Sequence, residues 1–124
     1  MQNSSSFPGV EERLRRIPLD RLHAHPANAN RMDPDAFEKL RENIQREGDY
    51  PPVIVRPHPD TPGHFQIIDG HNRTEVEREN GATYVVCYVW ECDDRTALVL
   101  LATLNRLEGQ DIPVIGNSMN LVSD

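Results

Sequence analysis

The chain has 124 residues, of which 37% are hydrophobic and 27% are charged, and its formal net charge is −7 at pH 7. This length supports one domain with its own core, and the composition is that of a soluble globular protein. The acidic balance argues against a protein that grips nucleic acid with its whole surface, and the lack of a long apolar run argues against a membrane partner.

Residues 1–13 are expected to be a disordered leader. They include three consecutive serines and a Pro-Gly pair, a composition typical of unstructured segments. No apolar stretch follows a basic region here, so we expect no secretory signal and a cytoplasmic location. Cys87 and Cys92 lack a second pair with zinc-site spacing and are expected to be free thiols.

A first strand is expected over residues 14–19, where apolar residues alternate imperfectly and Pro18 marks a sheet edge or the end of the strand. Residues 20–31 are expected to be irregular and carry the polar side chains that loops and ligand sites use. His23 and His25 lie in this loop and could form a metal site with Asp69, but two histidines at this spacing without a third histidine or cysteine are a weak signal.

A helix is expected from Pro34 to about Gly48. Asp33 can cap its first N–H groups, and Pro34 suits the first helical position. Gly48 supplies the stop. Apolar residues at helical spacing support this helix: Phe37, Leu40 and Ile44.

Two strands joined by a turn are expected next. Residues 53–55 form a short apolar run that ends at Arg56, and residues 57–63 contain three prolines and one glycine. Residues 64–68 form the second strand of this hairpin. Arg56 either lies near a ligand or pairs with a surface acid, and the sequence leaves both open.

Two helices and one strand are expected after the hairpin. A solvated helix covers about residues 72–80, and the strand over residues 84–90 is almost entirely β-branched or aromatic. This strand is expected to be buried on both faces, or to bury one face against a partner. The last helix begins at Asp93 or Asp94, carries a broad apolar face and ends near Leu107.

Strands and helices alternate around a small mixed sheet, so the expected fold class is α+β with flanking helices. We assign residues 14–111 to this domain. Residues 112–124 are expected to be a C-terminal tail, either a partner-binding arm or the link to a missing region. Periodicity alone leaves the topology open.

The central stretch of the chain is a buried strand, a glycine turn and a helix start, over residues 65–76. Gly70 permits backbone angles or a close approach that a Cβ would prevent. A helix start presents unpaired N–H groups and a locally positive dipole end, and Arg73 adds a guanidinium suited to phosphate. The turn is therefore a candidate anion site, with an ordinary strand-to-helix connection as the alternative.

Each side chain of this turn has a functional and a structural interpretation. Asp69 could bind magnesium or accept a proton, or it could cap the helix. His71 could bind phosphate or carry a proton, or serve as a structural donor. Arg73 could bind phosphate or form a salt bridge with Glu77, and Asn72 could contact phosphate or ribose, or face solvent.

Asn105 and Arg106 lie late on the last expected helix. They could face the same cleft as the central turn. The alternative is that they lie on the solvent side of the helix, where the dipole favours Arg106 near the C-terminus.

The order of these features resembles the N-terminal domain of ParB-like proteins, in the ParB/sulfiredoxin superfamily. The resemblance covers roughly residues 16–111 and depends on the set of features rather than on any single one. The segments that carry it are Ile17–Leu22, Pro52–Arg56, Ile67–Arg73 and Leu101–Leu107.

The resemblance implies a nucleotide-binding α+β domain. Partition proteins of this family bind CTP with Mg²⁺ and act as switches on DNA. Their triphosphate segment, Gly-Glu-Arg-Arg, corresponds to residues 70–73, where the glycine and the final arginine match. Their Glu-Asn-x-x-Arg segment corresponds to the region of Asn105 and Arg106, with different spacing and without the acid. Their DNA-reading helix-turn-helix has no counterpart here.

Other relatives with an Asp-Gly-His-His-Arg segment are free-serine kinases that use ADP or ATP. The chain is similar to them over residues 69–73, with Asn72 in place of one histidine. Their early-loop His-Glu pair is absent, because Pro26 follows His25. Sulfiredoxins place the reactive cysteine where this chain has His71, so sulfinic acid reductase activity is not expected.

The leading hypothesis is a ParB-like domain that binds a nucleoside triphosphate, CTP or ATP, with Mg²⁺ held by Asp69. Its expected context is a DNA-associated partition or regulatory process, with DNA contacted through a partner or a missing domain, and with pairing into a homodimer. One alternative is an enzyme with Asp69 and His71 as catalytic residues: a small-molecule kinase, an NTP hydrolase or a nuclease. The other is an interaction module without ligand.

Overall fold

The computed structural model describes residues 10–29, 31–48 and 50–108, and the structural statements below concern these residues. Five strands form one mixed sheet in the order β1-β5-β3-β4-β2. The strands are β1 (Leu14–Pro18), β2 (Leu22–His23), β3 (Val53–Pro57), β4 (Phe65–Asp69) and β5 (Tyr84–Val89). β1 pairs antiparallel with β5 and β3 with β4, whereas β3 pairs parallel with β5 and β2 with β4. The mixed sheet with its helices confirms the α+β class.

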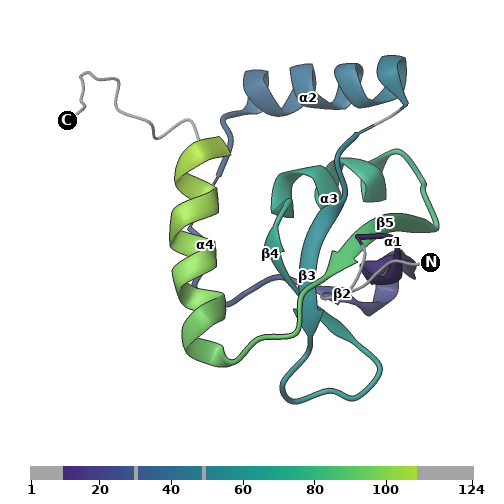
Figure 1. Cartoon of the computed structure of the whole chain (residues 1–124). Coiled ribbons are helices and arrows are strands. Elements are labelled where there is room, and N and C mark those ends of the chain that lie inside the picture. Colours follow the sequence, from purple (N-terminus) through teal and green to yellow (C-terminus); the bar gives the residue numbers. More distant parts are fainter. Residues whose placement is uncertain (1–9, 30, 49, 109–124) are drawn as a thin grey trace.

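The helices surround this sheet. They are α1 (Val10–Arg13), the short 3-10 helix η1 (Leu19–Arg21), α2 (Pro34–Glu47), α3 (His71–Glu79) and α4 (Asp94–Glu108). Figure 1 shows α2 across the top of the molecule, α3 beneath it, and α4 along one side. α2 packs against α3, α3 against β3, and α4 against β4. The start of α3 is thereby held between α2 and the sheet. Among the described residues, no helix has the length and apolar content needed to cross a membrane.

Helix α2 begins and ends where the sequence predicts. A carboxylate oxygen of Asp33 accepts a hydrogen bond from the Ala36 N–H at 2.8 Å, and Pro34 is the first helical residue. Gly48 adopts a left-handed conformation with φ 69°, and its N–H donates to the Ile44 carbonyl at 2.9 Å. Both ends are thus fixed by local chemistry that can be read from the sequence.

The expected hairpin is confirmed as the antiparallel pair β3 and β4. Val55 lies opposite Ile67, and the His58 N–H donates to the His64 carbonyl at 2.9 Å where the turn begins. Val55 and Ile67 are buried in the core, which gathers apolar side chains from all five strands. β4 ends at Asp69, so the hairpin places the central turn at the edge of this core.

Strand β5 is present, but its expected burial on both faces within the chain is wrong. Val85, Cys87 and Val89 are buried, whereas Tyr84 and Val86 on the opposite face are 45% and 39% exposed. β5 lies beside the edge strand β1 and contacts the short helix α1, whereas the long helix α4 packs against β4. The alternative expectation, a partner on the outer face of β5, stays a prediction.

The N-terminal part of the chain contains two short elements that the sequence pattern does not predict. η1 and β2 interrupt the expected irregular stretch over residues 20–31, and Leu22 of β2 is buried opposite Phe65. Two residues are too few to show a strand period, so only the pairing with β4 defines β2. α1 lies at the end of the expected leader; residues 1–9 and the expected tail, 112–124, lie outside the described residues.

Candidate functional site

The central turn has the predicted geometry of a strand, a glycine and a helix start. β4 ends at Asp69, Gly70 has φ 109°, and α3 begins at His71. A Cβ on Gly70 would lie 3.1 and 3.2 Å from the two methyl carbons of Val53. Both the left-handed conformation and the tight packing therefore favour glycine at this position.

Three polar atoms of this turn are buried and have no hydrogen-bond partner among the described residues. They are Oδ1 of Asp69, Nδ1 of His71 and Nδ2 of Asn72. An unmet buried polar group typically costs about 1–3 kcal/mol, so three neighbouring ones are unusual in a purely structural turn. Such a cluster is typical of a site whose partner is a ligand, an ion or ordered water.

A polar pocket of about 350 Å³ adjoins the turn. Its lining comes from the early loop, from β4 and from α3: Ala24, His25, Asn28, Arg31, Met32, Ile67, His71, Asn72, Glu75 and Arg78. The guanidinium groups of Arg31 and Arg78 line it, and that of Arg78 is bonded to the Leu19 and Leu22 carbonyls and to Glu75. The pocket thus combines cations with unmet donors, as an anion site requires.

A second pocket of about 270 Å³ also adjoins this turn and is lined mostly by apolar residues. Asp69, Gly70 and Arg73 contribute the turn side of its wall. The remaining lining residues are Met32, Leu40, Tyr50, Pro51, Pro52, Val53 and Asn72. Asn72 and Met32 line both pockets, so a polar hollow and a mostly apolar one adjoin at this turn.

Arg73 is held by protein groups. Its Nε lies 3.1 Å from a carboxylate oxygen of Glu77, and the two side chains are each 15% exposed. Its Nη1 donates to the Pro51 carbonyl, and the guanidinium lies 5.4 Å from the ring centre of Tyr50. The salt bridge with Glu77, which was the structural interpretation of Arg73 from the sequence, is therefore present.

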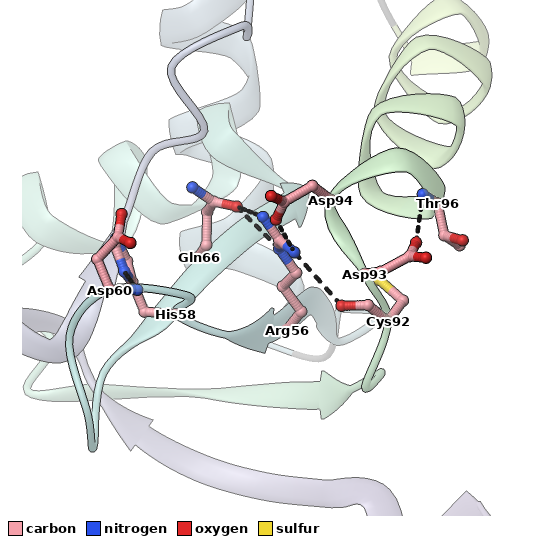
Figure 2. A network of polar contacts seen from close by, with 8 residues as sticks. All are labelled: Arg56, His58, Asp60, Gln66, Cys92, Asp93, Asp94 and Thr96. Atoms are coloured by element: carbon pink, nitrogen blue, oxygen red, sulfur yellow. Dashed lines mark hydrogen bonds and ion pairs between the residues drawn. The ribbon is translucent and has the colours of Figure 1, made fainter.

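Arg56 lines neither of these two pockets and belongs to a separate network, shown in Figure 2. Its Nε and Nη2 donate to Oε1 of Gln66 at 2.9 and 2.7 Å. Its Nη1 lies 3.3 Å from the Cys92 carbonyl and 2.9 Å from Asp94. These contacts join the hairpin to the start of α4, and they satisfy the alternative of pairing with a surface acid.

Asn105 and Arg106 lie on α4, as the sequence predicts. Their side chains lie outside the part of the chain that the structure describes. Their assignment to the ligand site stays a prediction.

The two early-loop histidines have separate partners. His23 Nε2 lies 2.8 Å from His64 Nδ1, whereas the His25 backbone N–H donates to His71 Nε2 at 3.1 Å. In the described chain no three His, Cys, Asp or Glu side chains are arranged to hold a metal ion. Asp69 offers Mg²⁺ the one buried carboxylate oxygen without a partner in the part of the chain that the structure describes, which fits a site that takes its other ligands from phosphate and water.

Burial controls the titration of the histidines at the pocket. It lowers the pKa of His71 to about 4, with a smaller contribution from His25. Burial and the charge of Arg56 lower the pKa of His25, against an opposing effect of Asp94. Both side chains are therefore neutral near pH 7.

The sequence identifies the turn but not the walls of the pockets. Its signals for the early loop are the polar composition of residues 20–31 and the two histidines within them, and neither predicts where the loop lies in the fold. His25, which is hydrogen-bonded to His71, is 46 positions away from it in the sequence. Tyr50 and Pro51 come from the connection between α2 and β3. Contacts across such distances in the chain depend on the topology, which periodicity does not give.

The chain matches the family model of the ParB N-terminal domain over residues 3–106. It is 28% identical over 107 residues to the chromosome-partitioning protein ParB of Caulobacter vibrioides, a match that covers 86% of this chain and 35% of that protein. This chain thus spans about a third of that relative.

Solved structures give the same assignment. A truncated ParB from Caulobacter crescentus complexed with CTP-γ-S has a TM-score of 0.65 at 29% identity, covering 88% of this chain and 57% of that chain. The same protein complexed to the centromeric parS site has a TM-score of 0.63 at 29% identity, covering 73% and 46%. Sulfiredoxin from Arabidopsis thaliana shares the fold, with a TM-score of 0.56 at 18% identity over 71% of this chain and 96% of that chain. The fold is therefore that of the ParB/sulfiredoxin superfamily, and the chain belongs to the ParB N-terminal domain family.

Proposed function

We propose that the turn from Asp69 to Arg73 binds a nucleoside triphosphate with Mg²⁺. The observation that carries this proposal is the set of three buried, unpartnered polar atoms on Asp69, His71 and Asn72. They lie at the start of α3, where backbone N–H groups and the helix dipole favour an anion. A ligand that supplied their partners would recover the free energy that their burial costs.

The two pockets offer different groups to the proposed nucleotide and its Mg²⁺ ion. The polar pocket, with Arg31 and the donors of His71 and Asn72, suits phosphate groups. Gly70 allows the backbone to approach the ligand closely. Asp69 is the proposed Mg²⁺ ligand.

Arg73 is also a proposed phosphate ligand, but its guanidinium must first break its bonds to other protein groups. Its guanidinium is bonded to Glu77 and Pro51, so nucleotide binding has to compete with these contacts. Asn105 and Arg106 are proposed to contribute from α4, whereas the contacts of Arg56 favour a role in holding α4 over a role at the ligand.

CTP is the first candidate, because a related ParB that is 29% identical was solved with CTP-γ-S; ATP is the second. The same relative was solved on parS DNA. We therefore place this chain in a cytoplasmic, DNA-associated partition or regulatory process, with DNA contacted through a partner or a further domain.

Isothermal titration calorimetry with CTP, ATP, ADP and GTP, with and without Mg²⁺, tests the proposal. We expect CTP or ATP to bind with Mg²⁺ and Asn72→Ala and Arg73→Ala to weaken binding. The loss of a hydrogen bond to a charged group costs about 1.5–3 kcal/mol, or roughly a ten- to hundredfold loss of affinity.

Arg41→Ala is the control for lost charge, because Arg41 pairs with Glu38 on the exposed side of α2, away from both pockets. The proposal is wrong if no nucleotide binds, or if all three variants bind like the wild type. The absence of any nucleotide binding would favour an interaction module without ligand.

An enzyme on the same site is the second candidate. Release of phosphate, formation of phosphoserine or cleavage of DNA would each identify its reaction class. The unpartnered oxygen of Asp69 makes this residue a stronger candidate for a general base than His71. We expect Asp69→Asn to abolish such an activity if it exists, while the protein keeps its fold.

A further inference from the structure

The two ring nitrogens of His71 have different surroundings, and the inference follows from this difference. Its side chain is only 6% exposed, and it lines the polar pocket. Nε2 lies 3.1 Å from the backbone nitrogen of His25. Nδ1 is buried and has no partner among the described residues.

The contact with His25 fixes the tautomer of His71. A backbone N–H can only donate, so Nε2 must be the unprotonated nitrogen that accepts. An imidazole ring whose Nε2 accepts a hydrogen bond carries its one proton on Nδ1. The unpartnered atom of His71 is therefore an N–H donor.

His25 is held in the opposite tautomer and secures this arrangement. Its Nδ1 accepts a hydrogen bond from the Ala27 N–H at 3.0 Å, so its own proton lies on Nε2. The Asn28 N–H donates to the His25 carbonyl at 3.0 Å. The turn over residues 25–28 thus presents the His25 N–H to His71 from an ordered backbone.

We infer that His71 is a tautomer-locked, neutral Nδ1–H donor to a phosphate oxygen of the ligand, positioned by the backbone of His25. The inference rests on the proposed nucleotide function and specifies its chemistry. A ring with its proton on Nδ1 and its Nε2 bonded to a backbone N–H has no lone pair to offer a ligand proton. His71 therefore binds and orients the ligand and does not act as the proton carrier considered from the sequence.

Two substitutions separate the roles of the two nitrogens. In His71→Asn, the side-chain amide can place an N–H near the position of Nδ1 and keep the ligand donor. In His71→Gln, the longer side chain can place an acceptor near the position of Nε2 and keep the contact with His25, but the ligand donor is lost. Thermal melts followed by circular dichroism establish that both variants fold.

Calorimetry with CTP and ATP in the presence of Mg²⁺ measures the outcome. We expect His71→Asn to bind within about threefold of the wild type and His71→Gln to bind roughly tenfold or more weakly. The opposite ranking, or equal binding by both variants and the wild type, overturns the inference.

A ligand-free measurement tests the tautomer directly. Two-bond ¹H–¹⁵N correlation spectra of the imidazole rings distinguish a proton on Nδ1 from one on Nε2, and the signals lost in His71→Asn assign the ring. We expect the Nδ1–H pattern for His71, and an Nε2–H pattern overturns the inference whether or not a nucleotide binds.

The two experiments also separate this inference from the function on which it rests. A wild-type chain that binds neither CTP nor ATP overturns the proposed function and the ligand role of His71 together. A wild-type chain that binds one of them, with the reversed ranking of the two variants, overturns only the inference.

Discussion

At Gly70 the backbone angle and the space beside the Cα both exclude a side chain. Gly70→Ala places a residue at φ 109° with its Cβ 3.1 Å from a Val53 methyl carbon. The left-handed conformation costs about 1–2 kcal/mol, and the overpacking adds about 1–3 kcal/mol. We expect urea unfolding to show the sum of both effects.

Gly81→Ala is the matched control, because Gly81 has φ 83° and no atom of the described residues lies within 4 Å of where its Cβ would be. This control should lose only the conformational part of the stability. Equal losses in the two variants would contradict the packing argument at Gly70.

The buried His71 makes stability depend on pH. Its pKa is about 4 in the folded protein and near 6.5 when unfolded, so the unfolded chain binds more protons between these values. The contribution of His71 is complete above the unfolded pKa and falls as pH drops through the window from about 6.5 to 4. The slope approaches about 1.4 kcal/mol per pH unit inside that window.

Urea unfolding of the wild type and His71→Asn at several pH values measures this effect. We expect the wild type to lose more stability than the variant between pH 7.5 and roughly 5. His25, whose pKa is also lowered, should leave a residual dependence in the variant. Parallel curves for the two proteins would contradict the assignment to His71.

Local rules at single residues were predictable from the sequence, and long-range partners were not. The cap at Asp33 and the stop at Gly48 depend on neighbouring residues only, and both are where the sequence predicts. Arg73 was correctly placed at the turn, but its bond to Pro51 spans 22 residues. A local sequence pattern can identify a charged residue as a candidate ligand, whereas the fold determines which protein groups already bond to its side chain.

At the scale of elements, Arg56 is the link between the hairpin and α4. Its side chain is 5% exposed, and its removal leaves the Gln66 oxygen and the Cys92 carbonyl without their donor. We expect Arg56→Ala to cost about 2–4 kcal/mol of stability, since each unmet buried group costs about 1–3 kcal/mol. Amide exchange of the first turns of α4 should accelerate more than exchange in α2.

Asp94→Asn is the control for this network. The Asp94 side chain is 81% exposed, and an exposed ion pair contributes about 0–1 kcal/mol. We therefore expect a loss of less than about 1 kcal/mol in chemical denaturation. A loss as large as that of Arg56→Ala would show that the ion pair, and not the buried hydrogen bonds, holds α4.

Among the elements, β5 shows where periodicity stops being informative. Its β-branched and aromatic composition predicted a strand correctly, because that preference is largely local. Which face is covered depends on its place beside β1 and on the packing of α4 against β4. The two-residue β2 was missed for the same reason: its existence depends on pairing with β4.

For the whole molecule, the net charge of −7 sets the expectation for DNA. The chain alone should bind a short duplex no more tightly than nonspecific attachment, with Kd at or above about 10⁻⁶–10⁻⁴ M at physiological salt. Fluorescence anisotropy over a series of salt concentrations, with and without CTP, measures this. Tight, sequence-specific binding by this chain alone would contradict the assignment of DNA contact to a partner or a further domain.

The contacts of Arg73 also have a mechanical consequence. Tyr50 and Pro51 belong to the connection that follows α2, and they hold the guanidinium together with Glu77 of α3. If the phosphates of a nucleotide bind this guanidinium, it leaves Tyr50 and Pro51, and the connection after α2 loses these contacts. Occupancy of the turn would then be transmitted to α2 through an exchange of partners by one side chain.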